Sequence, residues 1–293
     1  MSILIEGKYR IITRIGEGSF GDIFAGYNIN TNEKVAIKIS KIDSNILLKN
    51  EARIYNGLND INGLPVLRSF GMTGQYSYLI LDLLGNSLEY YKEQCGGRLS
   101  LKTVLMIGIR MLERIKMIHE RGILHRDINP DNFLFGRENE ENKLFLIDFG
   151  LAKLYVDSRN NHIEISDRNN LLGTSEYVSV NIHNGITPSR RDDLESIGYI
   201  LIYLLEGKLP WQEINIIDEN ECNYQIKEIK NLKSLWMLWD NIPGEFITFI
   251  KYCRSIEYDQ DPDYNYLKIL LSNLYKLHGF PVDNIYDWNN VSY

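Results

Sequence analysis

Apolar segments in the first third of the chain are short and are separated by turn residues, as in strands that are joined by hairpins. These segments cover residues 9–15, 23–27, 35–39 and 78–84. A glycine-rich stretch at 16–21 and the turn Asn30-Thr31-Asn32 lie between the first three, and residues 45–58 have a helical pattern. The pattern predicts a small N-terminal part that is mostly β-structure and contains one helix.

The rest of the chain has the longer period of helices. Residues 101–120 place apolar side chains on one helical face, at Val104, Ile107, Met111, Ile115 and Ile118. A short strand is predicted at 144–147 and an apolar helix at 196–205. We expect these apolar positions to form a core. Trp236 and Trp239 share a helical face, for which we favour core packing over a partner groove.

The glycine-rich stretch contains the spacing GxGxxG at Gly16, Gly18 and Gly21. This spacing alone is weak, because dinucleotide-binding folds and plain turns share it. A dinucleotide-binding fold would continue into a helix, whereas an extended segment follows here. The context favours a hairpin whose glycines let backbone amides approach phosphates. A hairpin without any ligand is the alternative.

Lys38 ends an otherwise apolar strand, where a buried ammonium group needs a partner. Glu51 lies in the helical stretch that follows, on a face shared with Leu47, Leu48 and Ile54. A pair between Lys38 and Glu51 would aim the ammonium at nucleotide phosphates. The alternative is a surface lysine at the end of a strand.

The stretch His125-Arg126-Asp127-Ile128-Asn129-Pro130-Asp131-Asn132 carries a carboxylate at Asp127 and a carboxamide five residues later. That spacing lets the aspartate orient a substrate hydroxyl while the asparagine binds a metal ion on nucleotide phosphates. The strand at 144–147 then delivers Asp148-Phe149-Gly150, whose carboxylate would hold magnesium between phosphates. Together these residues indicate phosphoryl transfer.

About thirty polar residues follow Gly150 and end at Gly173-Thr174-Ser175-Glu176-Tyr177. A loop of that length favours a functional or regulatory segment over a simple connection. Asp193 precedes the apolar helix, and we interpret it as a cap or a backbone clamp rather than a catalyst.

The composition is that of an ordinary soluble protein, with 44% hydrophobic and 24% charged residues among 293. A net charge of -7 without a basic cluster argues against nucleic-acid binding. Cys95, Cys222 and Cys253 have no metal-binding spacing. The start lacks a signal-peptide apolar region, and the longest apolar run is too short for a bilayer. We expect an intracellular protein, cytoplasmic and/or nuclear, that does not bind membranes.

With these residues assembled, the chain resembles the eukaryotic protein kinases and, among them, the casein kinase I family. The family-level segments are Leu83-Leu84-Gly85 with Ser87-Leu88, and residues 130–134, 146–153, 189–196, 209–212 and 262–264. Val178-Ser179-Val180-Asn181 is similar to the Ser-Ile-Asn variant of that family. The resemblance implies one α+β kinase domain over 1–293, with a small antiparallel β-rich N-lobe at 1–84 and a larger, mainly α-helical C-lobe at 85–293. It covers nearly the whole chain, so we expect a bare catalytic domain.

The resemblance also implies ATP and Mg²⁺ as cofactors. The positions implied for the nucleotide are Ile15, Gly16, Glu17, Gly18, Ser19, Phe20, Gly21, Ile23, Ala36, Lys38, Glu51, Leu81, Asp82 and Leu84. The implied catalytic positions are Asp127, Lys38 and Asn129, and the implied metal ligands are Asn132 and Asp148. Thr174 would brace the catalytic loop. The stretch 129–132 differs from the Ala-Ala-Arg-Asn of tyrosine kinases, which favours transfer to serine and threonine residues. The expected partners are therefore protein substrates. We expect the enzyme to be a monomer.

Asn129 departs from the family, which has a lysine beside the transferring phosphoryl group. A neutral donor in place of that charge would cost ~1–3 kcal/mol, or roughly ten- to a hundredfold in rate. We expect a slowed serine/threonine kinase. The alternative is a pseudokinase that binds nucleotide or protein partners as a scaffold, against which stand the intact Lys38, Glu51, Asp127, Asn132 and Asp148. A small-molecule phosphotransferase is a less favoured third class.

The sequence also departs from the casein kinase I family at the positions that set substrate preference. Casein kinase I recognises acidic or phosphorylated residues upstream of its target through a basic cluster. Positions of that cluster fall at Glu176, near Glu219 and Cys222, and at Asn170 in this chain. A reversed charge at Glu176 would repel a phosphoserine. We therefore expect no preference for acidic or primed substrates.

Overall fold

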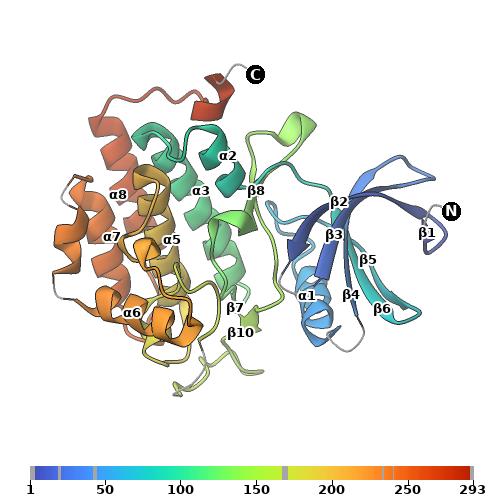
Figure 1. Cartoon of the computed structure of the whole chain (residues 1–293), viewed down its shortest axis with the longest axis horizontal. Coiled ribbons are helices and arrows are strands. Elements are labelled where there is room, and N and C mark those ends of the chain that lie inside the picture. Colours follow the sequence, from blue (N-terminus) through green and yellow to red (C-terminus); the bar gives the residue numbers. More distant parts are fainter. Residues whose placement is uncertain are drawn as a thin grey trace. The chain divides into compact units, whose positions relative to one another are not determined.

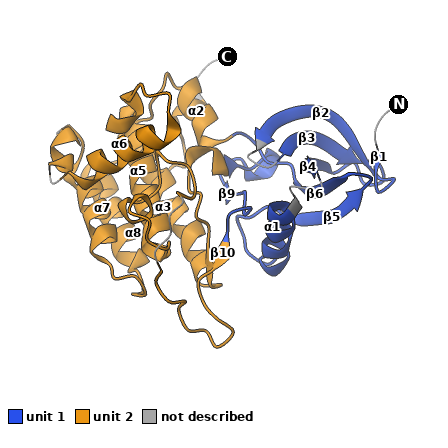
Figure 2. Ribbon diagram, turned by 60° about the horizontal axis from the view of Figure 1, so that its bottom comes forward, with its two compact units in different colours: residues 1–86, 133–152 blue, residues 87–132, 153–293 orange. Residues whose placement is uncertain are grey.

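The computed structural model describes residues 4–18, 21–41, 45–166, 171–232, 234–239 and 241–290. The chain forms two compact units (Figure 2). Unit 1 consists of Met1–Asn86 and Phe133–Ala152, and unit 2 of Ser87–Asn132 and Lys153–Tyr293. The lobe boundary expected between residues 84 and 85 stays a prediction. Ser19, Phe20 and Asn170 lie outside the described residues.

Unit 1 contains an antiparallel sheet with the strand order β1-β2-β3-β4-β6-β5 (Figure 1). Its strands are β1 (Leu4–Ile5), β2 (Tyr9–Gly18), β3 (Gly21–Asn28), β4 (Lys34–Lys41), β5 (Leu67–Thr73) and β6 (Tyr76–Asp82). Helix α1 (Asn45–Gly57) contacts β4, β5 and β6. Strands β8 (Phe133–Phe135) and β9 (Leu144–Leu146) form a separate hairpin. The β-rich N-terminal part with one helix is confirmed.

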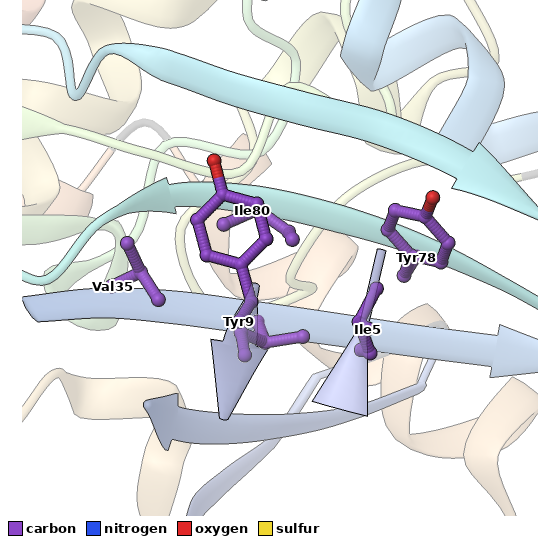
Figure 3. Packing of buried hydrophobic residues seen from close by; sticks show 6 residues of the cluster. Ile5, Tyr9, Val35, Tyr78 and Ile80 are labelled. Carbon is purple, nitrogen blue, oxygen red and sulfur yellow. The ribbon is translucent and has the colours of Figure 1, made fainter. Parts of the chain in front are cut away.

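One face of this sheet carries a buried cluster of Ile5, Tyr9, Val35, Ile37, Tyr78 and Ile80 (Figure 3). Side chains alternate between the faces of a strand, so the neighbours of Val35 and Ile37 on β4 point the other way. Lys38 is therefore turned toward the opposite face of the sheet. That face receives α1, because Lys38 contacts Glu51 of this helix.

Unit 2 is mainly helical (Figure 1). Its α-helices are α2 (Leu88–Gln94), α3 (Leu101–His119), α4 (Val180–His183), α5 (Arg190–Glu206), α6 (Glu219–Asn231), α7 (Gly244–Ser255) and α8 (Tyr264–Leu277). Its shorter elements are β7 (Ile123–Leu124), β10 (Lys153–Leu154) and the 3₁₀ helices η2 (Pro130–Asn132), η4 (Pro210–Glu213), η5 (Leu235–Trp239) and η6 (Asp287–Asn290). Helix α3 packs against α5 and α8, and α5 also packs against α7.

The predicted apolar face of α3 is confirmed, since its five apolar residues are fully buried. The helix expected at 196–205 begins earlier, at Arg190. The predicted helix was too short because residues 190–193 are polar, and polar residues obscure a helical pattern that depends on apolar spacing. Asp192 supports this first turn by accepting a hydrogen bond from Ser189 N at 2.7 Å. Gly207, with a φ of 86°, ends the helix.

Trp239 is buried, as core packing requires, and its ring meets that of Trp211 edge-on. Trp236 is half-buried and lies beneath Lys251 and Arg254. No helix within the described part of the chain is long and apolar enough to cross a membrane.

Candidate active site

The ammonium of Lys38 is the centre of the polar groups in unit 1. Its Nζ donates to Glu51 Oε2 at 2.8 Å and to Asp148 Oδ1 at 3.1 Å. The Lys38 and Glu51 side chains are only 8% and 2% exposed. The alternative of a surface lysine is therefore wrong. The expected pair with Glu51 is present, and Asp148 joins it as a second carboxylate that the spacing of the sequence did not reveal.

Burial disfavours the charged forms of these side chains, and their mutual electrostatic attraction favours them. Burial acts to lower the pKa of Lys38, but the carboxylates of Glu51 and Asp148 outweigh it and raise that pKa above its usual value. Burial raises the pKa of Glu51, and the Lys38 ammonium opposes that rise. One ammonium between two carboxylates leaves an excess of negative charge. A divalent cation at Asp148 would offset it.

Asp148 adopts a left-handed backbone conformation with a φ of 63°, which is uncommon for a residue with a side chain. The conformation is held locally. Asp148 Oδ1 accepts from Gly150 N at 3.2 Å, and Asp148 N donates to the hydroxyl of Tyr55 at 3.2 Å. Asn50 of α1 donates to the carbonyls of Gly150 and Ala152. Helix α1 thus fixes both Glu51 and the segment that carries Asp148.

Packing requires glycine at one position of the β2–β3 hairpin and not at another. Gly21 has a φ of 154°, and a Cβ there would lie 2.1 Å from Ile39 O, so the approach of β4 excludes any side chain. At Gly16 a Cβ would meet only the end of the Ile23 side chain, at 4.0 Å. Packing does not require glycine at this position. A bare backbone facing open space fits a group that approaches from outside, such as a phosphate.

Five of the predicted nucleotide positions lie on β3, β4 and β6 and fall on two faces of the sheet. Ile23 pairs with Lys38, and Ala36 pairs with Leu81, so these four residues share one face. Asp82 pairs with Val35 and lies on the other face. Its carboxylate accepts from Arg68 Nε at 2.6 Å and from the backbone of Val66. The side chain of Asp82 is thus committed to the protein, and a contact of Asp82 with a nucleotide stays a prediction.

Three more predicted nucleotide positions lie on β2 or after β6. Glu17 is paired with Arg14 at 2.7 Å, and Ile15 is half exposed on β2. Leu84 lies in the connector after β6. These positions are placed by the sheet, and their contacts with a nucleotide stay predictions.

In unit 2 the catalytic loop lies between β7 and η2, and its aspartate is held by Thr174. Asp127 Oδ1 accepts from Thr174 N at 3.0 Å and from Thr174 Oγ1 at 2.7 Å. Among the residues that the structure describes, the one contact of Asp127 Oδ2 is longer, 3.4 Å from Asn132 Nδ2. One carboxylate oxygen is thus committed to the protein. The other retains its capacity to accept a hydrogen bond.

Asn132 directs its amide nitrogen at Asp127. Its Nδ2 donates to the carbonyl of Asp127 at 2.9 Å, and the side chain is largely buried. This leaves the carboxamide oxygen as the group that Asn132 can offer to a ligand. Magnesium prefers oxygen ligands, so the carboxamide oxygen of Asn132 and the carboxylate of Asp148 are each of the type that this ion binds.

Asn129 is a structural residue of the loop. Its Oδ1 accepts from the backbone N–H groups of Asp131 and Asn132, both at 3.1 Å, and its Nδ2 donates to Thr174 Oγ1 at 3.1 Å. Asn129 therefore caps η2 and ties it to Thr174. A lysine has no acceptor and cannot make the capping bonds. Sequence reasoning missed this role, although an asparagine before Pro-Asp-Asn is a recognisable turn signal.

Asp193 clamps the start of the catalytic loop, as expected. Its carboxylate accepts from His125 N at 2.8 Å and Arg126 N at 2.9 Å. It also lies 3.0 Å from His119 Nε2. Burial acts to raise the pKa of Asp193, but the bonds to His119 and His125 outweigh it and lower that pKa. Asp193 thus remains a carboxylate, and it orients the backbone that precedes Asp127.

A family model for the protein kinase domain matches residues 9–262 of the chain. The chain belongs to the protein kinase family. Its two-lobed α+β fold class, with an antiparallel sheet followed by a helical region, agrees with that membership. Membership makes the protein a phosphotransferase by family and implies ATP, typically with Mg²⁺, and protein substrates. The match spans every position that the sequence proposed for the site.

One titrating group of the kinase lies beside the segment that follows Thr174. His183 Nε2 is 3.1 Å from Ser175 O and 3.1 Å from Lys230 Nζ. Burial, together with the charge of Lys230, lowers the pKa of His183 from 6.5 to about 3. Below about pH 6.5 the unfolded chain therefore binds a proton that the folded kinase does not.

We predict that this difference makes the kinase sensitive to acid. From His183 alone, the free energy of unfolding should fall by up to ~1.4 kcal/mol for each pH unit below about 6.5. The change His183→Gln removes the titrating group, so the variant should lose stability less steeply. Urea unfolding of both proteins at about pH 7, 6 and 5 measures the two slopes. Equal slopes would contradict the assignment.

Proposed function

We propose that this kinase transfers the γ-phosphate of ATP to serine and threonine hydroxyls of proteins and belongs to the casein kinase I family. The observation that carries the proposal is the pair of oxygens on Asp127. Thr174 holds Oδ1 through two hydrogen bonds, and Oδ2 is left to accept a hydrogen bond from a substrate hydroxyl.

Lys38 and Glu51 would orient the nucleotide. An ammonium that is held between two carboxylates has a fixed position and stays charged, as the electrostatic stabilisation of phosphates requires. The backbone at Gly16 would lie over the phosphates, while Ile23, Ala36 and Leu81 supply an apolar surface on the face of the sheet that carries Lys38.

Asn132 and Asp148 would hold magnesium through side-chain oxygens. The ion would neutralise charge on the phosphates when bound. Asn132 can do this without rearrangement, because its nitrogen is already committed to Asp127. Asp148 is held by Gly150 and Lys38 through a single oxygen, Oδ1.

We also propose a substrate preference that differs from that of casein kinase I. Helix α6 begins at Glu219, is capped by Asp218 and carries Glu221 in its first turn. These carboxylates, together with Glu176, favour neutral or basic residues upstream of the target and disfavour phosphoserine. The kinase would thus catalyse the same reaction as casein kinase I on a different set of proteins.

A pseudokinase is the second candidate. The observation that favours it is the commitment of Asn129 to Asp131, Asn132 and Thr174, which leaves no charge from this position beside the phosphoryl group. We favour the enzyme, because a scaffold has no need for the arrangement of Lys38 with Asp148 or of Asp127 with Thr174.

The proposed function is tested by identifying which residues of a peptide the protein phosphorylates. The purified chain is incubated with Mg²⁺, ATP and a peptide library that contains serine, threonine and tyrosine, and the modified residues are located by mass spectrometry. We expect phosphoserine and phosphothreonine without selection for upstream acidic or phosphorylated residues. Phosphotyrosine as the main product would overturn the serine/threonine assignment. Strong selection for upstream phosphoserine would overturn the proposed preference.

A further inference from the structure

A fully buried lysine lies beneath the segment that follows Thr174. Lys230, in the last turn of α6, is 0% exposed. Its Nζ donates to three backbone carbonyls, Ser175 O at 3.0 Å, Glu176 O at 3.0 Å and Val178 O at 2.7 Å. An isolated amine would gain nothing from such burial, since removing a charged group from water is costly. The contacts with the carbonyls offset part of that cost, and burial still lowers the pKa of Lys230 well below its usual value.

Aromatic rings surround the same ammonium. Nζ lies 4.9 Å from the ring centre of Tyr199 and 4.8 Å from that of Trp211. Both distances are within the range of cation–π attraction. Trp211 also donates from Nε1 to Glu176 O at 2.8 Å. The carbonyl of Glu176 is therefore bound from two directions.

Helix α6 provides a second anchor and is itself fixed. The side chain of Asn223 accepts a hydrogen bond from Ser175 Oγ. At the other end of the helix, Lys230 O accepts from Arg254 NH1 at 3.0 Å. Arg254 Nε donates to Glu195 Oε1 at 3.0 Å, which ties the end of α6 to α5 and α7. The ammonium thus connects residues 175–178 to the packed helices.

The segment that Lys230 holds begins directly after Thr174. Thr174 donates to Asp127 and accepts from Asn129. A shift of residues 175–178 would displace the chain that carries Thr174, together with the Glu176 side chain. The contacts of Lys230 with this segment all lie within unit 2.

We propose that Lys230 is a positioning residue for the protein substrate: it fixes residues 175–178 in the form that receives the peptide around the target hydroxyl. The inference rests on the proposed function and deepens it, because it assigns the positioning of the peptide-binding segment, residues 175–178, to α6 and its buried lysine. Lys230 touches neither nucleotide nor substrate.

The test compares two lysines of one helix. Lys230→Met removes the ammonium and keeps the length of the side chain, while Lys227→Met makes the same change one turn earlier on a half-buried side chain. We expect Lys230→Met to raise KM for the best peptide of the library by about tenfold or more, because residues 175–178 lose three hydrogen bonds and Val178 O loses the donor that Lys230 supplies. KM for ATP should stay unchanged, and Lys227→Met should behave as the wild type.

Asn223→Ala serves as a second, milder variant if Lys230→Met does not fold. It removes the bond to Ser175 Oγ alone, and it should raise KM for the peptide in the same sense but less. Equal changes in both KM values, or no change in the peptide KM of whichever variant folds, would overturn the proposal.

Hydrogen exchange separates this inference from the proposed function. The amides of residues 174–178 should exchange faster in Lys230→Met, or in Asn223→Ala, than in the wild type and in Lys227→Met. This readout needs no turnover. A wild type that transfers no phosphate would overturn the proposed function, and the exchange result would still decide on Lys230. Unchanged exchange at 174–178 would overturn the role of Lys230 even in an active enzyme.

Discussion

Asp127→Asn should lower the rate of phosphate transfer by about 10²- to 10⁴-fold and leave nucleotide binding unchanged. The substitution keeps the size of the side chain. Its remaining oxygen can still accept the two hydrogen bonds from Thr174, so the loop should hold its conformation. The group that replaces Oδ2 is an amide nitrogen, which donates and cannot accept the hydroxyl proton.

A matched control lies four residues later in the same loop. Asp131 accepts from Ser87 Oγ at 3.1 Å and has no contact with Thr174 among the described residues. Asp131→Asn makes the same chemical change and should retain most of the activity. Initial rates with γ-labelled ATP, together with calorimetric titration of the nucleotide, measure the two effects separately. Transfer by Asp127→Asn at the wild-type rate would show that Asp127 does not orient the hydroxyl.

Lys38→Met should weaken both the fold and the reaction. The change removes the ammonium from between Glu51 and Asp148 and leaves a fully buried carboxylate without its cation. Breaking a buried ion pair from one side costs about 3–5 kcal/mol. We expect the lower end of that range, because burial already raises the pKa of Glu51 and an unpaired Glu51 can take up a proton. Loss of the phosphate contact should slow transfer by roughly a hundredfold.

Two controls locate this effect in the ion pair. Lys34→Met alters an exposed lysine on the same strand and should change the free energy of unfolding little. The double variant Lys38→Met/Glu51→Gln should be more stable than Lys38→Met alone, because it no longer buries an unpaired charge. Urea unfolding measures stability, and titration with ATP measures binding. A single variant as stable as Lys34→Met would contradict the pairing.

The contacts that the sequence revealed are those that follow from a local chemical need. A lysine in an apolar strand requires a carboxylate, and the next helix contains Glu51 on its apolar face. Asp193 opens a buried helix, which indicates a cap or clamp. In both cases the type of interaction could be predicted because a buried polar group has few ways to be satisfied.

The contacts that the sequence did not reveal join distant residues. Asp148 reaches Lys38 across 110 positions, and Lys230 reaches Val178 across 52. Their partners are set by packing, which no local pattern records. The sequence identified Asn129 only as a position without the positive charge of a lysine. Its capping role depends on the turn formed by η2 and on the position of Thr174.

Asn129 is therefore the residue on which the central claim depends. Asn129→Lys introduces a positive charge beside the proposed site of phosphate transfer, but it gives up the two capping bonds to Asp131 and Asn132. We expect the free energy of unfolding to fall by ~1 kcal/mol while phosphate transfer becomes faster.

The most direct test of the claim that this protein is an active kinase is the rate of γ-phosphate transfer from labelled MgATP by the wild type and Asn129→Lys, side by side. The account predicts transfer by the wild type above the background of Asp127→Asn, with Asn129→Lys faster by roughly ten- to a hundredfold at most. A wild type at that background beside a strongly active Asn129→Lys would contradict it and identify the protein as a scaffold.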